Sequence, residues 1–500
     1  MAAFSSCHEK TRDCVLTLDS LSVLRDEATY LRPQAIRTGM ERMAYADTGT
    51  SAAARYTRNY YLGGGNMLWL SRMGVSSAAD SVLRYAGEVE GWGFDREIFC
   101  YTAIKNDLRR VRELDFSGEG NDINTVFARL EYRLTKAYLL YCSGQRFGYV
   151  NPREVFSHVE VRDSDSARVT YNTLFDIPLQ KADKAFFAES VHKVQADSAA
   201  AWLRESCPQD PLYEQLRRRL AQASGESERR LVLCNMERCR WRLNDYPWRH
   251  KKYVFINLAS QHLEAVDGDN VLTMRIGCGA QQTKTPLLTS RIKRLDVNPQ
   301  WIIPRSIIKK SIAHRAGDVH YFESHRYFIR DRKTGKEVPP ALVTSSMLTD
   351  GNYLVIQRGG AGNALGSIIF RFDNNFSVYL HDTSNRDVFS NADRSVSHGC
   401  IRVERPFDLA AFLLAGRDDD MIDRVRYSMT FYDDKKGLDE KEVESMKDPK
   451  LFVRSVDVTP QIPLFITYYT LYSDRQGVMH TYPDIYGYDP LIYENLKKYL

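Results

Sequence analysis

Apolar residues recur at steps of three and four positions over 123–142, which is the period of an amphipathic helix. Asp122 can cap the start of this helix, and Gly144 can end it. The same spacing returns among the leucines of 212–220, with a run of arginines on the other side. Residues 60–220 are therefore predicted to form a mostly helical domain.

From about position 251 the pattern changes to the two-residue period of strands. The turn-forming residues at 267–270 predict a hairpin, and a short helix is expected over 406–415. Near the C-terminus, two apolar segments flank 474–477 and are expected to pair as a hairpin on the same sheet. The predicted fold class is α+β, a helical half followed by a mainly β half. Strands are expected at 253–258, 262–266, 271–276, 463–471 and 478–482.

Two alternating segments carry reactive side chains. In 376–381 apolar residues alternate with Tyr379 and His381, and in 398–404 they alternate with Cys400 and Arg402. Side chains two residues apart in a strand share a face. If the two strands are neighbours, a thiol, an imidazole, a phenol and a guanidinium lie on one surface.

That set of groups can perform acyl transfer. A free thiol near neutrality is only a few per cent thiolate, so Cys400 needs a base, and His381 could supply it. Gly399 allows a tight turn, and the backbone amides beside it could face a developing oxyanion. The alternative is that His381 is an ordinary hydrogen-bonded histidine and Cys400 a small, half-buried residue.

The motif Ser-His-Gly-Cys-Ile-Arg at 397–402, with His381 upstream, resembles the signature of the YkuD-type L,D-transpeptidases, cysteine enzymes that cross-link bacterial peptidoglycan. Residues 360–366, 378–383 and 485–489 resemble the large, scaffolded branch of that family, the YcbB type. The similarity covers most of 250–500 and, more loosely, the helical half.

The resemblance implies roles for individual residues. Cys400 would attack a donor tetrapeptide stem, expel its terminal D-alanine and pass the acyl group to an amine of another stem. His381 would be the base and later the acid, oriented by a backbone carbonyl near Asp382. Gly399, His398 and Tyr379 are candidates for shaping the site or stabilising the oxyanion. Candidates for contacting substrate or shaping the backbone around it are Arg402, Ser397, Asn363 and Trp301. Arg402 could instead form a salt bridge with Glu404 or Asp382.

The expected organisation is an N-terminal segment, partly disordered; a helical scaffold domain; a connecting linker or helix; and a catalytic domain. The eight residues between Leu220 and Arg229 are too few for the small peptidoglycan-binding domain that many relatives carry. By resemblance, the polar and basic stretch 310–357 caps the active site; a plain solvated insertion is the alternative. The boundaries are 1–59, 60–220, 221–250 and 251–500, the last ending in a hairpin and tail at 456–500.

Composition limits the partners. The chain has 500 residues and a net charge of only +5, too weak to indicate a nucleic-acid partner. Among nine cysteines no spacing completes a zinc site, so a structural metal is not expected. No cofactor is expected either. Peptidoglycan stem peptides, and cell-wall synthesis proteins, are the partners that the family implies, with a periplasmic location. The sequence Phe-Ser-Ser-Cys at 4–7 resembles the end of a lipoprotein signal, which would make Cys7 a lipid anchor; chance is the alternative.

Two other functions fit the same residues. Transfer of the acyl group to water would make an L,D-carboxypeptidase or an amidase. A non-enzymatic protein that binds the wall through its helical half is the third hypothesis, although the complete Cys/His signature argues against it.

Overall fold

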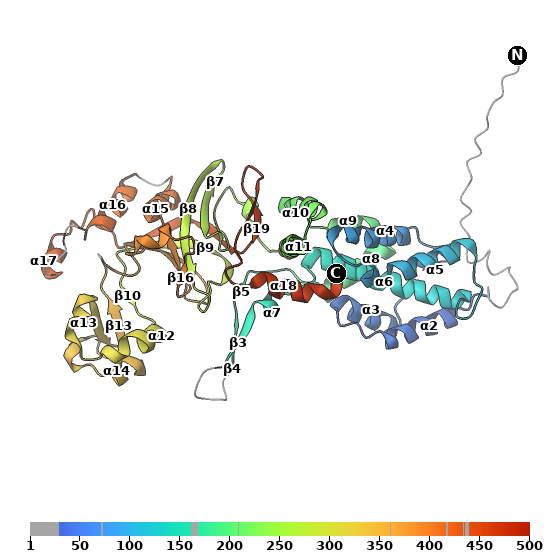
Figure 1. Cartoon of the computed structure of the whole chain (residues 1–500), viewed down its shortest axis with the longest axis horizontal. Helices are drawn as coiled ribbons and strands as arrows, with labels where there is room; N and C mark the ends of the chain where they lie inside the picture. Colours follow the sequence, from blue (N-terminus) through green and yellow to red (C-terminus); the bar gives the residue numbers. More distant parts are fainter. Residues whose placement is uncertain are drawn as a thin grey trace, which may run out of the picture.

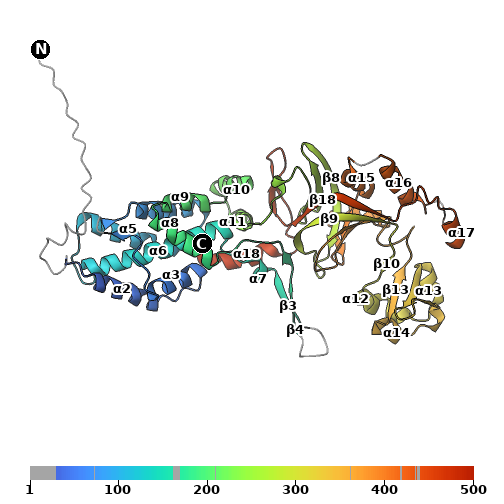
Figure 2. The ribbon, with the colours of Figure 1, turned by 180° about the vertical axis from the view of Figure 1, so that it is seen from behind.

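The computed structural model describes residues 30–71, 74–161, 169–208, 210–360, 362–416, 419–433, 435 and 440–500. The molecule is elongated: a helical half lies at one end, a large sheet lies in the middle, and a small lobe lies at the end opposite the helical half (Figures 1 and 2). The α+β class predicted from the sequence is confirmed. None of the helices in the described ranges is long and apolar enough to cross a membrane.

The helical half is built around α6 (Ile123–Phe147), which is buried on most sides. Asp122 caps it as predicted, by accepting hydrogen bonds from the N–H groups of Asn124 and Thr125. The helix does not end at Gly144, since it continues to Phe147. Around it pack α2 (Pro33–Ala46), α3 (Ala52–Leu62), α4 (Ala78–Glu88), α5 (Tyr101–Glu113), α8 (Lys184–Gln195), α9 (Ala199–Ser206), α10 (Pro211–Gln222) and α11 (Glu226–Arg240).

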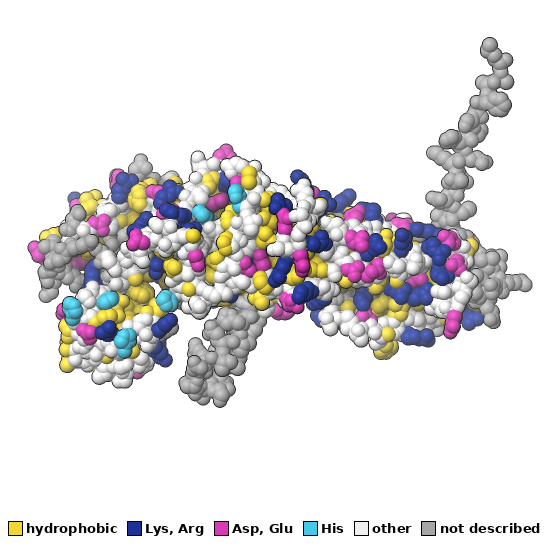
Figure 3. Space-filling view, viewed as in Figure 1, with side chains coloured by type: hydrophobic (Ala, Val, Ile, Leu, Met, Phe, Trp, Pro, Cys, Tyr) yellow, Lys and Arg dark blue, Asp and Glu magenta, His cyan; other side chains and the backbone are white. Residues whose placement is uncertain are grey.

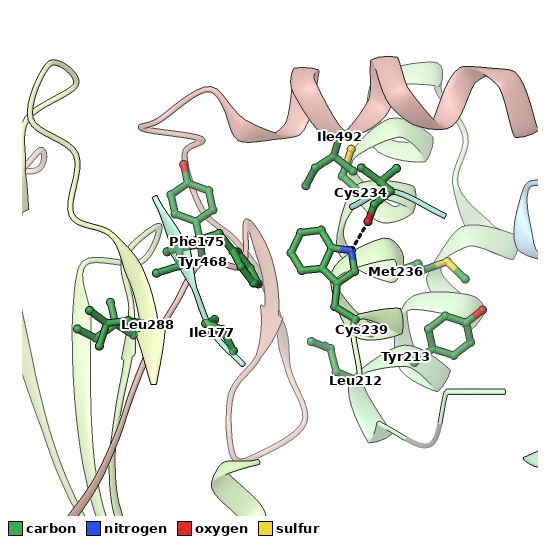
Figure 4. Packing of buried hydrophobic residues seen from close by; sticks show 14 of the residues in the cluster. Phe175, Ile177, Leu212, Tyr213, Cys234, Met236, Cys239, Leu288, Tyr468 and Ile492 are labelled. Atoms are coloured by element: carbon green, nitrogen blue, oxygen red, sulfur yellow. Dashed lines mark hydrogen bonds between the residues drawn. The ribbon is translucent and has the colours of Figure 1, made fainter. Parts of the chain in front are cut away.

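The connecting segment after α10 is a core element. On α11 the guanidinium of Arg238 lies 2.6 Å from the carboxylate of Asp489, and both side chains are almost fully buried. Asp489 belongs to α18 (Tyr488–Leu496), so the C-terminal helix ties the two halves together. One apolar core runs through both halves without a break. Figure 4 shows this junction, with Leu212 and Met236 on the helical side and Phe175 and Leu288 on the sheet side.

The large sheet begins with an antiparallel meander of β6 (Lys252–Asn257), β7 (His262–Asp267) and β8 (Asn270–Gly279), with the turn where it was predicted. The strand β14 (Ile368–Phe372) pairs with both β15 (Leu380–His381) and β9 (Leu287–Val297), which closes the strands into a barrel. The order around it is β14, β15, β17 (Ile401–Val403), β8, β7, β6, β18 (Ser455–Thr467) and β9. The helical half adds β5 (Phe175–Asp176) to the edge of β9, and β16 (Ser395–Ser397) pairs with β8.

The tail differs from the prediction. The apolar segment 463–471 is not one hairpin strand, because its first part belongs to β18, between β6 and β9 inside the sheet. The hairpin is smaller and consists of β19 (Leu471–Ser473) and β20 (Met479–Thr481). The predicted helix at 406–415 is present as α15 (Pro406–Leu414), and it is followed by α16 (Asp419–Thr430) and α17 (Glu440–Ser445).

The small lobe, called the cap below, is inserted between β9 and β14 and includes 310–357. Its four-stranded sheet has the order β10 (Trp301–Ile302), β13 (Tyr353–Gln357), β11 (Tyr327–Asp331) and β12 (Glu337–Val338). The helices α12 (Arg305–Ile307), α13 (Val319–Ser324) and α14 (Ser345–Asp350) surround it. A separate apolar cluster that includes Phe322 and Ile329 fills the lobe. The cap therefore has a core of its own, separate from the core of the large sheet.

Candidate active site

The two reactive segments are neighbours in the barrel. The strands β15 and β17 pair in parallel, with Leu380 opposite Ile401 and His381 opposite Arg402. Tyr379 and Cys400 lie one step earlier, since the N–H of Ile401 donates to the carbonyl of Tyr379 at 2.9 Å. This register puts the thiol, phenol, imidazole and guanidinium on one face.

The first of these strands is shorter than its alternation predicts. Only two residues are extended and paired, because Ser377 has φ +55° and the side chain of Asn374 accepts hydrogen bonds from the N–H groups of Phe376 and Val378. A side chain that bonds to nearby backbone competes with sheet pairing. The strand therefore begins at Leu380, directly before the histidine.

His381 is held as a neutral base. Its ring is almost fully buried, and Nδ1 donates to the carbonyl oxygen of Asp382. Because a carbonyl can only accept, Nδ1 carries the proton, and the lone pair of the neutral ring is on Nε2. Burial lowers the pKa of His381 to about 4, with the charge of Arg402 acting in the same direction. The carbonyl partner expected near Asp382 is thus present.

Cys400 is half-buried, and burial raises the pKa of its thiol, although the Tyr379 N–H and the Arg402 charge oppose that shift. A raised thiol pKa beside a lowered imidazole pKa favours the uncharged pair at neutral pH. The groups therefore fit base-assisted attack better than a preformed thiolate–imidazolium pair.

The turn before Cys400 is fixed from several sides. Gly399 has φ +112°, a backbone conformation that favours glycine. The Ser397 hydroxyl donates to the carbonyl of Cys400 at 2.5 Å and accepts the N–H of Gly399 at 3.1 Å. The Gly399 amide is therefore occupied, whereas within the described ranges the Cys400 N–H has no hydrogen-bond partner.

Arg402 faces the site without a carboxylate partner among the described residues. Of the two candidates, Glu404 pairs with Arg275, and Asp382 pairs with Arg386 at 3.2 Å. The Nε atom of Arg402 is buried with no hydrogen bond to the described chain. The salt bridges considered from the sequence are thus not formed, and the guanidinium is available to an anion.

Three further features bear on the predicted chemistry. No group of three or more His, Cys, Asp or Glu residues that could hold a metal occurs in the described part of the chain. Seven cysteines, Cys400 included, are free thiols there. The predicted lipid anchor at Cys7 lies outside the described residues.

Comparison with known proteins now adds to the geometry. Residues 251–426 match the family model YkuD, the L,D-transpeptidase catalytic domain, and residues 54–220 match the model of the Scaffold domain. The chain carries a YkuD-family catalytic domain that follows a scaffold domain in the sequence. Every candidate active-site residue, from Trp301 to Arg402, lies within the YkuD match, whereas α18 lies beyond it.

A curated protein of Haemophilus influenzae, named a putative L,D-transpeptidase, is 29% identical over 257 residues, which are 49% of this chain and 48% of that protein. The chain thus spans about half the length of this relative. A solved structure, the Ldtfm–avibactam carbamoyl enzyme, aligns over 62% of this chain and 74% of its own at 11% identity, with a TM-score of 0.19, too low to support an argument.

In the YkuD domain, Asn363 shapes a loop. Its side chain is 1% exposed and donates to the carbonyls of Pro299 and Arg358, while it accepts the N–H of Leu365. These bonds join the returning end of the cap to its outgoing end. Asn363 is thus placed to hold the entrance of β14 and not to reach a substrate.

Trp301 and His398 lie apart from the paired strands. Trp301 is on β10 and packs partly on the apolar core of the cap. His398 is exposed and lines a pocket of about 760 Å³, together with Lys284, Phe376 and Tyr488. Neither Trp301 nor His398 therefore lies on β15 or β17, the two paired strands of the candidate site.

The sequence did not indicate the residues that hold the turn before Cys400 in place. The Thr285 hydroxyl donates to the carbonyl of Gly399 at 2.9 Å, and the Thr285 N–H donates to the Tyr486 hydroxyl at 3.1 Å. Tyr486 donates in turn to the carbonyl of Gly279 at 2.8 Å. The resemblance at 485–489 was the one available signal, and it did not indicate a contact with the cysteine turn.

Proposed function

We propose that the protein is a peptidoglycan L,D-transpeptidase with Cys400 as nucleophile. The observation that carries the proposal is the pairing of β15 with β17, which sets a neutral, carbonyl-oriented His381 beside the cysteine strand. The matches to the catalytic-domain model and to the Haemophilus protein support peptidoglycan as the substrate class.

In the proposed first step, Nε2 of His381 takes the thiol proton while the sulfur of Cys400 attacks the carbonyl before the terminal D-alanine of a tetrapeptide stem. The N–H of Cys400 and the hydroxyl of Tyr379 face the resulting oxyanion. One such donor is typically worth about 10² to 10³ in rate. The tetrahedral intermediate collapses when the C–N bond breaks and His381 protonates the leaving amine.

The second step reverses the roles. An amine of an acceptor stem attacks the thioester, His381 removes a proton from that amine, and the C–S bond breaks to release the Cys400 thiol. A new amide bond then joins two stems. Proton transfer by a positioned histidine typically contributes about 10² to 10⁴ in rate.

Arg402 is proposed to bind a carboxylate of the stem. Its guanidinium is charged at all ordinary pH values, and the described chain offers it no carboxylate. A partly buried cation without a counterion is stabilised when a ligand supplies one. A stem peptide, which carries free carboxylates, meets this requirement, and its place in the wall implies a periplasmic or cell-envelope location.

The test is mass spectrometry of the products formed from purified disaccharide-tetrapeptides by the wild type and by Cys400→Ala. Cross-linked dimers that lack one alanine, absent with Cys400→Ala, are the expected result. Tripeptides alone would identify an L,D-carboxypeptidase, because water would then be the acceptor. Products that persist with Cys400→Ala would contradict the assignment of the nucleophile.

The non-enzymatic hypothesis has a separate test. A thiol-reactive probe should label Cys400 in the folded wild type faster than it labels the buried cysteines, and Cys400→Ala should abolish that fast labelling. An absence of turnover, together with an unreactive Cys400, would favour a wall-binding scaffold.

A further inference from the structure

We propose that Thr285 is a positioning residue for the reaction: its hydroxyl aims the backbone N–H of Cys400 at the oxyanion that forms during acyl transfer. The inference rests on the proposed function, in which this N–H is one of the oxyanion donors. It gives a role to a buried side chain that takes no part in the catalytic steps described above.

The backbone around the nucleophile leaves one donor unused. The N–H of Gly399 donates to the Ser397 hydroxyl at 3.1 Å, and the N–H of Ile401 donates to the carbonyl of Tyr379 at 2.9 Å. The carbonyl of Cys400 accepts the Ser397 hydroxyl at 2.5 Å. Between these groups, the N–H of Cys400 has no partner among the described residues. This amide therefore remains for an oxyanion.

The direction of that N–H is set by the carbonyl of Gly399, because both groups belong to one peptide unit. A trans peptide is planar, and its C=O and N–H point to opposite sides. The hydroxyl of Thr285 donates to this carbonyl at 2.9 Å and is the only donor that the described residues offer to it. The N–H of Cys400 is thus held pointing away from the interior in which Thr285 is buried.

The Thr285 hydroxyl can donate in one direction only. It accepts the N–H of Gly279 at 2.9 Å, so its own proton is left for the carbonyl of Gly399. The side chain is fully buried, and a β-branched side chain has few rotamers to change to. A chain of hydrogen bonds also polarises the groups it joins, which strengthens the N–H of Cys400 as a donor.

Tyr486 holds Thr285 in turn. Its hydroxyl accepts the N–H of Thr285 at 3.1 Å and donates to the carbonyl of Gly279 at 2.8 Å. The three residues Gly279, Thr285 and Tyr486 are called the brace below. Tyr486 lies beyond residues 251–426, which match the YkuD model, so the C-terminal segment takes part in positioning the oxyanion donor.

The brace and the cap are separate parts of the structure. Tyr486 packs in the apolar core that the two halves share, whereas the cap has its own core and forms a separate lobe (Figure 3). The carbonyl that orients His381 is that of Asp382, outside the brace. A change in the brace should therefore disturb the oxyanion donor and leave the base in place.

Two reactions of the same thiol separate these effects. In acylation by p-nitrophenyl acetate, the sulfur of Cys400 bonds to the acetyl carbon, His381 takes the thiol proton, and the tetrahedral oxyanion collapses with loss of nitrophenolate. In alkylation by iodoacetamide, the sulfur displaces iodide and no oxyanion forms. An oxyanion donor should therefore matter only in the first reaction. Neither probe requires peptidoglycan.

The variants are Thr285→Val, which removes the hydroxyl at nearly constant shape, and Thr285→Ser, which keeps it. The matched control is Thr283→Val. The Thr283 hydroxyl donates at 2.7 Å to the carbonyl of Ser397 in the same turn, but that carbonyl also accepts the N–H of Ala280 at 2.9 Å. The peptide unit of Ser397 thus keeps a partner in the control. Cys400→Ala supplies the background from other cysteines.

Thr285→Val should slow acylation about tenfold and leave alkylation unchanged, since loss of a whole oxyanion donor costs about 10² to 10³ and here the donor is only misaligned. Thr285→Ser should restore acylation, and Thr283→Val should alter neither rate. An equal loss in acylation and alkylation would indicate a merely structural role and would overturn the proposal. Unchanged acylation in Thr285→Val would overturn it too.

Tyr486→Phe carries the test if Thr285→Val does not fold. It removes the hydroxyl that holds Thr285 but keeps the ring, and a selective loss of acylation is again expected. With disaccharide-tetrapeptides, the loss should appear in kcat and not in KM, because the donor acts on the transition state. A loss that alkylation shares, or one confined to KM, would contradict the positioning role.

The two probes also separate this proposal from the proposed function. If the wild type forms no cross-links but its acylation by the ester depends on Cys400 and Thr285, the proposed function fails and the positioning role stands. If cross-linking depends on Cys400 but both reactions are unaffected in Thr285→Val, only the positioning role fails.

Discussion

The carboxylate of Asp382 accepts hydrogen bonds from both the N–H and the hydroxyl of Ser367, each at 2.9 Å. The carbonyl of the same Asp382 orients His381. Ser367, in the loop that returns from the cap, thus holds Asp382 in place, and Asp382 in turn orients His381. Gly366 adjoins this arrangement with φ +65°, and a Cβ there would lie 2.4 Å from the Asp382 side chain.

Gly366→Ala should therefore impair catalysis more than stability. The added methyl group must push Asp382 and turn the imidazole away from its carbonyl, and we expect kcat to fall by about 10- to 100-fold, since small displacements of catalytic groups can cost this much. Gly416→Ala is the control, because Gly416 has φ +89° but open space around it. Steady-state kinetics together with urea unfolding separate the two effects; equal kinetic losses in both variants would disprove the link.

The pH dependence follows from the two shifted groups. His381 must be neutral to accept a proton, and burial lowers its pKa to about 4, so kcat/KM should decline only as the pH falls towards 4. An unperturbed histidine would cause the decline near pH 6.5. A pH–rate profile between 3.5 and 8 checks this, and an acid limb centred above 6 would contradict the neutral-base geometry.

The thiol should titrate at the other end of the range. Burial raises the pKa of Cys400, so alkylation of the free enzyme by iodoacetamide should keep accelerating above pH 9. Cys400→Ala supplies the background from other cysteines. A plateau already reached at neutral pH would show a preformed thiolate and would replace base-assisted attack.

Tyr486→Phe should destabilise the protein and loosen the cysteine turn. It removes one hydroxyl that serves both Gly279 and Thr285, and an unsatisfied buried group costs about 1–3 kcal/mol. Tyr488→Phe is the matched control, because the hydroxyl of Tyr488 is buried without a hydrogen bond in the described structure. We expect urea unfolding to report a loss for the first variant only; a similar loss for both would argue against this role.

The ion pair between Arg238 and Asp489 should couple the two halves. Asp489→Ala leaves a buried guanidinium without its partner, and breaking such a pair costs about 3–5 kcal/mol. Since one core runs through both halves, the wild type should unfold in one transition, and the variant should unfold earlier. Calorimetry measures the unfolding temperature of both variants, and Glu214→Ala, which breaks an exposed ion pair, is the control. Equal unfolding temperatures for Asp489→Ala and Glu214→Ala would count against the coupling.

Sequence patterns predicted the elements whose signals are local. The period of α6 and its cap at Asp122 were correct, but Gly144 was misread as a helix end. A Cβ at Gly144 would lie 2.2 Å from the ring of Tyr149, so this glycine serves close packing inside the helix. A glycine in a helical pattern does not itself tell these two uses apart.

Those parts of the candidate site that belong to a short sequence motif could be predicted. Cys400 and His381 were named from their spacing and from the resemblance, and their strands are paired in the structure. The brace from Tyr486 to Thr285 spans 201 residues and left no local pattern.

The measurement that tests the account most directly is the intact mass of the enzyme after mixing with a donor tetrapeptide and no acceptor amine. The account predicts one added acyl group, equal to the donor less one alanine, on Cys400, with free D-alanine released in equal amount. The adduct should be absent from Cys400→Ala and should form more slowly in His381→Gln. D-alanine release by the wild type without any adduct on Cys400, unchanged in Cys400→Ala, would contradict the central claim.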